Sequence, residues 1–193
     1  LGHQEVQQLL NLLSRESPKL VEDLIPKLLT SAVVQKVLQN LLSEGVTIRD
    51  MRTIMETLIE YAPHTQDPAD LTAKVRIKLG RAITQQLFPH SNEMSVISLE
   101  NNLERILMQA VSGGGDNVSI EPGIAQTLAA QANDAARSQE KMGHSPVLLV
   151  ASPLRATLAK FLKRVTPNLR VLSHEELPDS KTIRVANLIG GSL

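Results

Sequence analysis

Apolar residues recur every three or four positions through the first ninety residues, which is the spacing of one face of an α-helix. One such face lies near the start of the chain. A second runs from Val33 to Leu42, and Gly45 then favours a left-handed C-cap. Asp67-Pro68 predicts another helix start, because a capping carboxylate precedes a proline suited to the first helical position. Residues 1–90 therefore predict a helical subdomain.

The segment from Thr47 to Ala62 carries the apolar stripe of a further helix. We predict that Thr47 is its N-cap and that Asp50, three residues later, places its acid at the positive end of the helix. On this register Arg49 and Arg52 share one helix face and present two guanidinium groups together. The order of helices and turns in this subdomain also resembles a winged-helix core, in topology only.

The pattern changes after the turn-rich segment Phe88–Glu93. Four segments have the composition of β-strands, and the second is a continuous apolar run that suits a central strand: 94–99, 147–151, 170–172 and 183–189. Helices separate the first three, and Ser152-Pro153 is expected to cap the last helix. The order β-α-α-β-α-β-β predicts a small α/β sandwich over residues 91–193. The whole chain is therefore predicted to be of the α+β class, a winged-helix-like helical subdomain followed by the sandwich.

Charge and composition narrow the possible partners. Lys+Arg and Asp+Glu both number 20, and no segment forms a basic arm, so nucleic acid and anionic membrane surfaces are not expected partners. The chain has no cysteine, which excludes disulfides and thiolate metal sites. No apolar run approaches the roughly 18 residues of a membrane helix. Because the chain starts at Leu1 within a predicted helix, we expect a piece of a longer protein.

No motif predicts catalysis. Gly113–Gly115 is followed by Asp116 rather than by the Gly-Lys-Ser/Thr of a phosphate loop, so a solvated linker is expected. Ser152 lacks the glycines of a nucleophile elbow. Glu175-Glu176 is interpreted as a solvated cap of a short turn. The five histidines lack metal-ligand spacing. We therefore expect a protein that is not an enzyme and needs no cofactor or metal.

Arg49, Asp50 and Arg52 are the only charged cluster interleaved with a strong apolar stripe. One interpretation is helix capping with solvated arginines. The other is a protein-interaction site, because the forked guanidinium suits protein interfaces better than the lysine ammonium does.

Several segments resemble, in order along the chain, the family of flagellar type III export-gate proteins, also called the FHIPEP family. They are Leu1–Gln7, Lys36–Leu42, Ile48–Ile54, Leu79–Gln86, Leu103–Ala110, Gly113–Gly115, Glu121–Gly123, Pro146–Val150 and Ile189–Gly191. Injectisome relatives share Ile48-Arg-Asp50 but resemble the chain less in the last subdomain, so the flagellar branch is favoured over an injectisome homologue.

The resemblance implies an export gate anchored in the bacterial inner membrane by a part absent from this chain. Residues 1–90 and 91–193 would be the third and fourth subdomains of its cytoplasmic half, with no membrane contact of their own. Family members form a nonameric ring that receives flagellar chaperone–substrate complexes and works with the export ATPase complex and FlhB. The main chaperone pocket of the family lies mostly in the first two subdomains, so no pocket residue is assigned here.

Two rival classes stay open on the residues alone. The helical half by itself would suit a winged-helix nucleic-acid-binding regulator, although it lacks a basic face. The α/β half could hold a small-molecule enzyme, whose ligand would bind at the carboxyl ends of the strands near Ser152.

Overall fold

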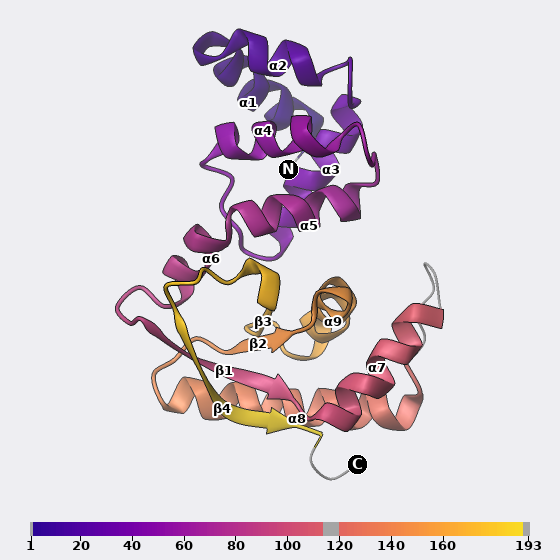
Figure 1. Ribbon diagram of the computed structural model, residues 1–193, viewed down its shortest axis with the longest axis vertical. Helices are drawn as coiled ribbons and strands as arrows, with labels where there is room; N and C mark the ends of the chain where they lie inside the picture. Colours follow the sequence, from indigo (N-terminus) through magenta and orange to yellow (C-terminus); the bar gives the residue numbers. More distant parts are fainter. Residues whose placement is uncertain (1, 114–119, 191–193) are drawn as a thin grey trace. The chain divides into compact units, whose positions relative to one another are not determined.

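The computed structural model describes residues 2–113 and 120–190 (Figure 1). The chain divides into two compact units, Leu1–Ile83 and Thr84–Leu193. The division falls within α6 (Gly80–Leu87), ahead of the boundary that the sequence predicts at residue 90. The predicted glycine loop continues from Gly113 into residues 114–119, which lie outside the described residues.

The first unit is helical. Its helices before α6 are α1 (His3–Glu16), α2 (Pro18–Leu24), α3 (Ser31–Ser43), α4 (Met51–Tyr61) and α5 (Pro68–Lys78). α5 packs against both α3 and α4, and α1 packs against α2. The described residues of this unit form no strand, so the likeness to a winged helix does not extend to a wing.

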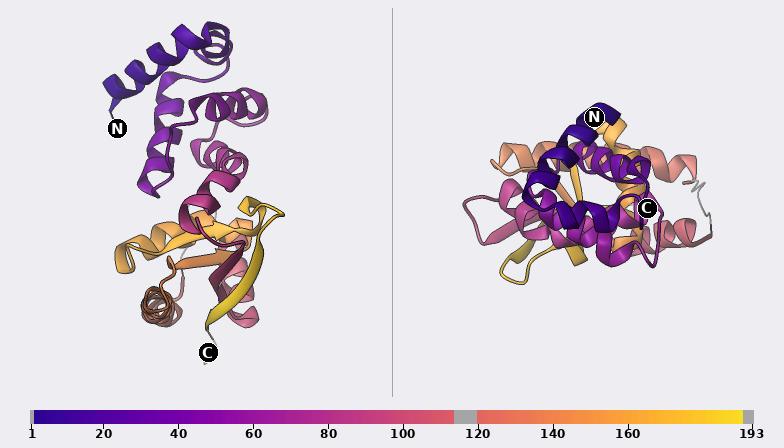
Figure 2. Two further views of the ribbon diagram at one scale, coloured as in Figure 1. Left: turned by 90° about the vertical axis from the view of Figure 1, so that its left-hand side faces the viewer. Right: turned by 90° about the horizontal axis from the view of Figure 1, so that it is seen from above.

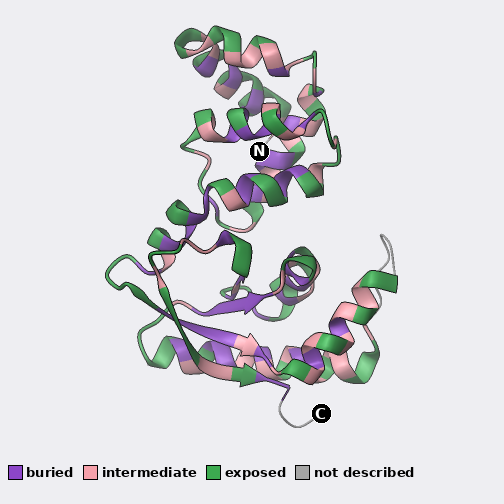
Figure 3. Cartoon of the chain, in the orientation of Figure 1, coloured by how far each residue is buried: buried purple, intermediate pink, exposed green. Residues whose placement is uncertain are grey.

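Local end signals position two of these helices as the sequence predicts. The carboxylate of Asp67 accepts a hydrogen bond from the amide of Asp70 at 3.3 Å, with Pro68 as the first residue of α5. Gly45, after α3, has φ +75°, a left-handed conformation that glycine adopts without steric cost. The core between the helices is aliphatic. Its fully buried members are Leu24, Val34, Val37, Leu38, Leu41, Ile54, Leu58, Leu71 and Val75, together with Met55 (Figure 3).

The second unit is a parallel sheet with helices. Its elements after α6 are β1 (Glu93–Leu99), α7 (Asn101–Gly113), α8 (Pro122–Lys141), β2 (Val147–Val150), α9 (Ser152–Val165), β3 (Arg170–Ser173), the 3₁₀ turn η1 (His174–Glu176) and β4 (Thr182–Ile189). The strands lie in the order β3-β2-β1-β4, and all three pairings are parallel. The predicted strands, their order along the chain and the mixed helix-and-sheet class are confirmed.

One face of the sheet carries the hydrophobic core of this unit. Ile97 and Leu99 of β1 and Leu148 of β2 belong to one buried cluster, together with leucines and alanines of α7, α8 and α9. Gly190 closes β4 beside this core with φ +105°. A Cβ atom at Gly190 would lie only 2.8 Å from the Leu103 side chain, so glycine is required there for space as well as for conformation.

Two local predictions in this unit are wrong. Ser152 is the first residue of α9 rather than its cap: Ala151 occupies the N-cap position, and its side chain makes no capping hydrogen bond. Glu176 is buried rather than solvated, although the predicted capping box at Ser173 is present. Glu175, its neighbour, is exposed. A carboxylate buried in this way requires a partner.

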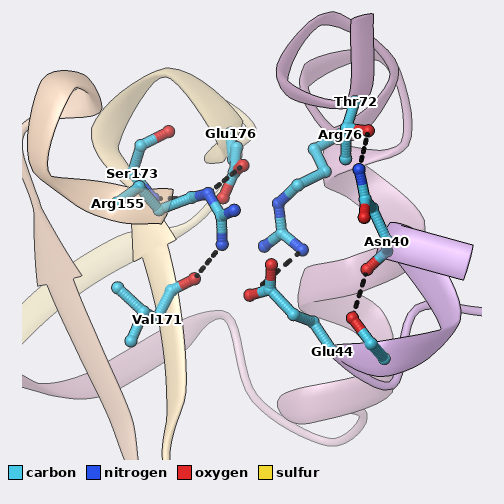
Figure 4. Close-up of polar contacts among 9 residues, drawn as sticks. Asn40, Glu44, Thr72, Arg76, Arg155, Val171, Ser173 and Glu176 are labelled. Carbon is cyan, nitrogen blue, oxygen red and sulfur yellow. Dashed lines mark hydrogen bonds and ion pairs between the residues drawn. The ribbon is translucent and has the colours of Figure 1, made fainter. Parts of the chain in front are cut away.

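That partner is Arg155 of α9, which is also buried (Figure 4). Its Nε lies 3.7 Å from the Oε2 of Glu176, and its guanidinium donates a hydrogen bond to the carbonyl of Val171 at 3.3 Å. The other oxygen of Glu176 accepts a hydrogen bond from the amide of Ser173 at 3.0 Å. The pair therefore fastens the end of β3 and the turn η1 to α9.

Substituting Glu176→Ala should destabilise the chain by about 3–5 kcal/mol, because it leaves the buried guanidinium of Arg155 without its counter-charge. Glu175→Ala, at the exposed neighbouring position, should change stability by no more than about 0.5 kcal/mol. Chemical denaturation of both variants measures the difference. Equal unfolding midpoints would show that the buried pair contributes nothing beyond its exposed neighbour.

Candidate protein-interaction site at the start of α4

Asp50 caps α4. Its Oδ1 accepts a hydrogen bond from the amide of Thr53 at 3.1 Å, and its Oδ2 accepts one from the Thr53 hydroxyl at 2.6 Å. The predicted cap, Thr47, instead accepts a hydrogen bond from the amide of Arg49 at 3.2 Å and forms a small turn before the helix. The helix therefore begins at Met51, and the prediction of Thr47 as N-cap with Asp50 at N3 is wrong.

The shift in the helix start separates the two arginines. Arg52 lies in the first turn of α4, whereas Arg49 precedes the helix. The two arginines therefore do not share a helix face, and the prediction that they do is wrong. Arg49, Asp50 and Arg52 are all exposed. The structure thus keeps the three charged residues at one helix start but gives each a different environment.

Arg52 is engaged within its own unit. Its guanidinium donates a hydrogen bond to the hydroxyl of Ser17 at 2.5 Å, and Ser17 lies at the junction of α1 and α2. The Arg52 guanidinium also lies 3.8 Å from the Glu56 carboxylate, with both side chains more than half exposed. An exposed pair of this kind stabilises little, about 0.5 kcal/mol. The main role of Arg52 is therefore to connect the start of α4 to the α1–α2 junction.

Arg49 is the group of this site that the fold leaves available. Its backbone amide is used by Thr47, but its guanidinium makes no hydrogen bond or ion pair with any residue that the structure describes. A guanidinium offers several N–H donors in a planar fork that matches a carboxylate. The exposed guanidinium of Arg49 can therefore donate hydrogen bonds to a carboxylate or a carbonyl group.

A second buried arginine went unnoticed in the sequence. The Arg76 side chain, in α5, is 2% exposed, and its guanidinium lies 3.9 Å from the carboxylate of Glu44 at the end of α3. Beside it, the Asn40 amide donates a hydrogen bond to the Thr72 hydroxyl at 3.1 Å (Figure 4). These contacts join α3 to α5 and are structural. The only signal in the sequence is the spacing of Thr72 and Arg76, which lie four positions apart and therefore on the same face of α5.

Within residues 2–113 and 120–190, no three potential metal-ligating side chains come together. None of the helices in that part of the chain has the length and hydropathy needed to span a bilayer.

Solved structures with the same fold include a cytosolic domain from a type III secretion system, that of EscV. The chain superposes on the Chlamydia pneumoniae CdsV protein with TM-score 0.90 at 26% identity, covering 98% of this chain and 55% of that one. A second CdsV structure, in complex with CdsO, gives TM-score 0.89 at 25% identity, with 98% and 56% coverage. The nonameric EPEC SctV-C gives TM-score 0.86 at 25% identity, with 97% and 57% coverage.

Sequence comparison narrows this class. The FHIPEP family model matches residues 1–182, and the chain belongs to the FHIPEP family. The flagellar biosynthesis protein FlhA of Salmonella typhimurium is 55% identical over 190 residues, which are 98% of this chain and 27% of that protein. The chain thus spans about a quarter of the length of the curated relatives that it matches. The identity favours the flagellar branch over the injectisome branch.

Asp50→Ala should destabilise the chain by about 1 kcal/mol, because the amide of Thr53 and the helix start lose their capping acceptor. Asp50→Asn should retain most of that stability, since asparagine caps nearly as well as aspartate. Urea titrations of both variants against the parent chain measure the effect. If Asp50→Ala were as stable as the parent, the cap would not hold the start of α4.

Proposed function

We propose that this chain is a cytoplasmic part of a flagellar type III protein export gate at the bacterial inner membrane. There it serves as a ring-forming docking platform for export substrates, their chaperones and the export ATPase complex. The observation that carries the proposal is the match to FlhA, 55% identical over nearly the whole chain. The superposition on CdsV and on the nonameric SctV-C also supports it.

Self-assembly and partner binding are proposed by analogy with two relatives. SctV-C is described as nonameric, and CdsV as forming a complex with CdsO. We infer that this chain contributes to a ring of the same kind in its full-length protein, with FlhB among its partners. We further propose that it acts by binding rather than by catalysis, because its exposed cluster at the start of α4 suits recognition of a protein surface.

Within this function, Arg49 is the proposed contact to a neighbouring subunit or an export partner. Its guanidinium is exposed and unused by the described fold, so a partner can engage it without breaking an internal contact. Arg52 differs, because its hydrogen bond to Ser17 stabilises the unit itself. Single substitutions therefore separate the interface role from the structural one better than a double substitution does.

In the full-length protein, Arg49→Ala should impair motility and secretion, while the melting temperature of this chain stays within a few degrees of the parent. Arg49→Lys should restore secretion only in part, because an ammonium keeps the charge but loses the planar fork. Swarming assays and the amount of exported flagellar protein measure the effect. Lys36→Ala, which removes an exposed cation from α3, is the control and should leave export unchanged.

Two results would contradict the interface role. Normal motility with Arg49→Ala would assign the arginine to a solvated surface. A large loss of stability in the isolated chain would make Arg49 structural. The docking function itself is tested separately, by pull-down of chaperone–substrate complexes with this chain and with the complete cytoplasmic part.

The isolated chain should be mainly monomeric at micromolar concentration. A ring assembled at a membrane gains from the high local concentration that anchoring provides, and free chains in dilute solution do not have that gain. Sedimentation velocity over a range of concentrations measures the assembly state. Stable nonamers in dilute solution would show that these residues assemble without anchoring.

A further inference from the structure

β4 is an edge strand with one side open. It pairs with β1 along its whole length, and no strand in the described part of the chain pairs with its other side (Figures 1 and 2). Alternate backbone N–H and C=O groups of an edge strand point away from the sheet, where they can pair with another chain. β4 is eight residues long, twice the length of β2 or β3.

Three large apolar side chains lie on one face of β4. The register pairs Ile183 with Met94, Val185 with Val96 and Leu188 with Ser98. Residues 94, 96 and 98 of β1 point to the same face, because strand side chains alternate, and paired residues share a face. Ile183, Val185 and Leu188 therefore form one apolar row, which we call the β4 row.

The β4 row is open to solvent. Its side chains are 45%, 52% and 62% exposed, whereas Met94 and Val96, their neighbours on β1, are fully buried. Figure 3 shows the same contrast, with β4 largely exposed beside the buried central strands. A bulge at Ala186 keeps the row continuous, because the register shifts by one residue between Val185 and Asn187.

Features that usually block an edge are missing from this strand. Proteins protect exposed edges with lysine, proline or inward-pointing charges. Residues 182–189 contain one charged side chain, Arg184, and no proline. Arg184 pairs with Ser95, so it points to the opposite face from the β4 row, and its guanidinium lies 3.8 Å from the Glu93 carboxylate.

We propose that the open edge of β4 accepts an extended polypeptide segment as a fifth strand of the sheet. The main chain of the segment pairs with the free backbone groups of β4, and its alternate apolar side chains cover the β4 row. Recognition of this kind takes affinity from the main chain and selects only for alternating apolar residues. The partner class is therefore an unfolded segment of protein with β-forming composition, rather than one fixed sequence.

The available area favours an extended segment over a second folded copy of this chain. A strand of eight residues is about 26 Å long, and a neighbouring strand covers on the order of 300 Å² of it. A stable interface between folded proteins buries about 800 Å² on each partner. The edge alone falls well short of that, but it is sufficient for strand addition by a short peptide.

The inference goes beyond the docking role proposed above and stands on the edge geometry alone. It involves the second unit, whereas the proposed contact at Arg49 belongs to the first. Impaired secretion by Arg49→Ala with no strand addition at β4, or normal secretion by Arg49→Ala with strand addition at β4, would separate the two proposals.

The test uses the 193-residue chain and a labelled synthetic peptide of about eight alternating threonine and valine residues with terminal lysines. A matched peptide with alternate amide nitrogens methylated keeps the side chains but loses main-chain donors. Fluorescence anisotropy measures affinity, and amide hydrogen exchange reports protection of Thr182–Leu188. The first peptide should bind and slow exchange in β4, and the methylated peptide should do neither.

Two lysine substitutions in the β4 row, Val185→Lys and Leu188→Lys, should each weaken peptide binding about tenfold, because lysine at an edge opposes strand pairing. Both positions are exposed, so the melting temperature should stay unchanged. Leu12→Lys, at an apolar residue 58% exposed on α1, is the matched control and should bind like the parent.

Three outcomes would overturn the proposal. The first is an absence of β4 protection at about 1 mM peptide, the weak limit of specific binding. The second is equal binding by the methylated peptide, which would mean that contact is made through side chains only. The third is protection of β4 that rises with protein concentration without peptide, together with dimers in sedimentation. That result would make a second copy the occupant of the edge.

Discussion

Parallel pairing of β1 with strands on both sides is the constraint on which the second unit depends. Parallel neighbours cannot be joined by a tight hairpin, so the chain must leave the sheet between β1, β2 and β3 and return through helices. Those helices cover one face of the sheet and supply its core. β4 then joins β1 on the only side still available, and it is left with an open edge.

The same constraint explains why a buried ion pair lies at the end of β3. The chain leaves β3 at one edge of the sheet and must reach β4 at the other, so the turn at η1 has to be held in place. Glu176 holds this turn by accepting a hydrogen bond from the amide of Ser173 and by forming an ion pair with Arg155 of the preceding helix. Arg76 and Glu44 join α3 to α5 in the first unit. Most of the other buried side chains are aliphatic. The two ion pairs therefore specify contacts between elements that apolar packing alone specifies less strictly.

The two surfaces proposed here consist of groups that the fold does not use. At the start of α4, Asp50 accepts the capping hydrogen bond and Arg52 donates a hydrogen bond to Ser17. The guanidinium of Arg49 is left exposed. In the sheet, one side of β4 pairs with β1. The backbone groups on its other side are left without a neighbouring strand among the described residues, and the side chains of the β4 row are left exposed. A side-chain fork and a backbone edge recognise different things. The first suits a folded neighbour with acidic groups, and the second suits an extended chain.

The sequence by itself determined the elements and the family. Helical and alternating periodicity located the helices and strands, Gly45 and Asp67 marked helix ends correctly, and segments spread over the whole chain carried the resemblance to the FHIPEP family. These signals are local, since each acts within one or two turns of backbone. They can therefore be recognised without knowing the tertiary contacts of the segment. The cap of α4 was missed by three residues because Thr47 and Asp50 are both good caps.

Only the tertiary structure decided which polar groups are buried and which apolar groups are not. Glu175 and Glu176 are adjacent and identical in type, yet one is exposed and the other is paired with an arginine from another helix. Val147 and Val185 are both strand valines, yet one is central and fully buried while the other lies half exposed on an edge. Burial depends on which distant segments meet and on the order of strands in the sheet. Neither is encoded in the local pattern, because strand order and long-range pairing arise only when the chain packs.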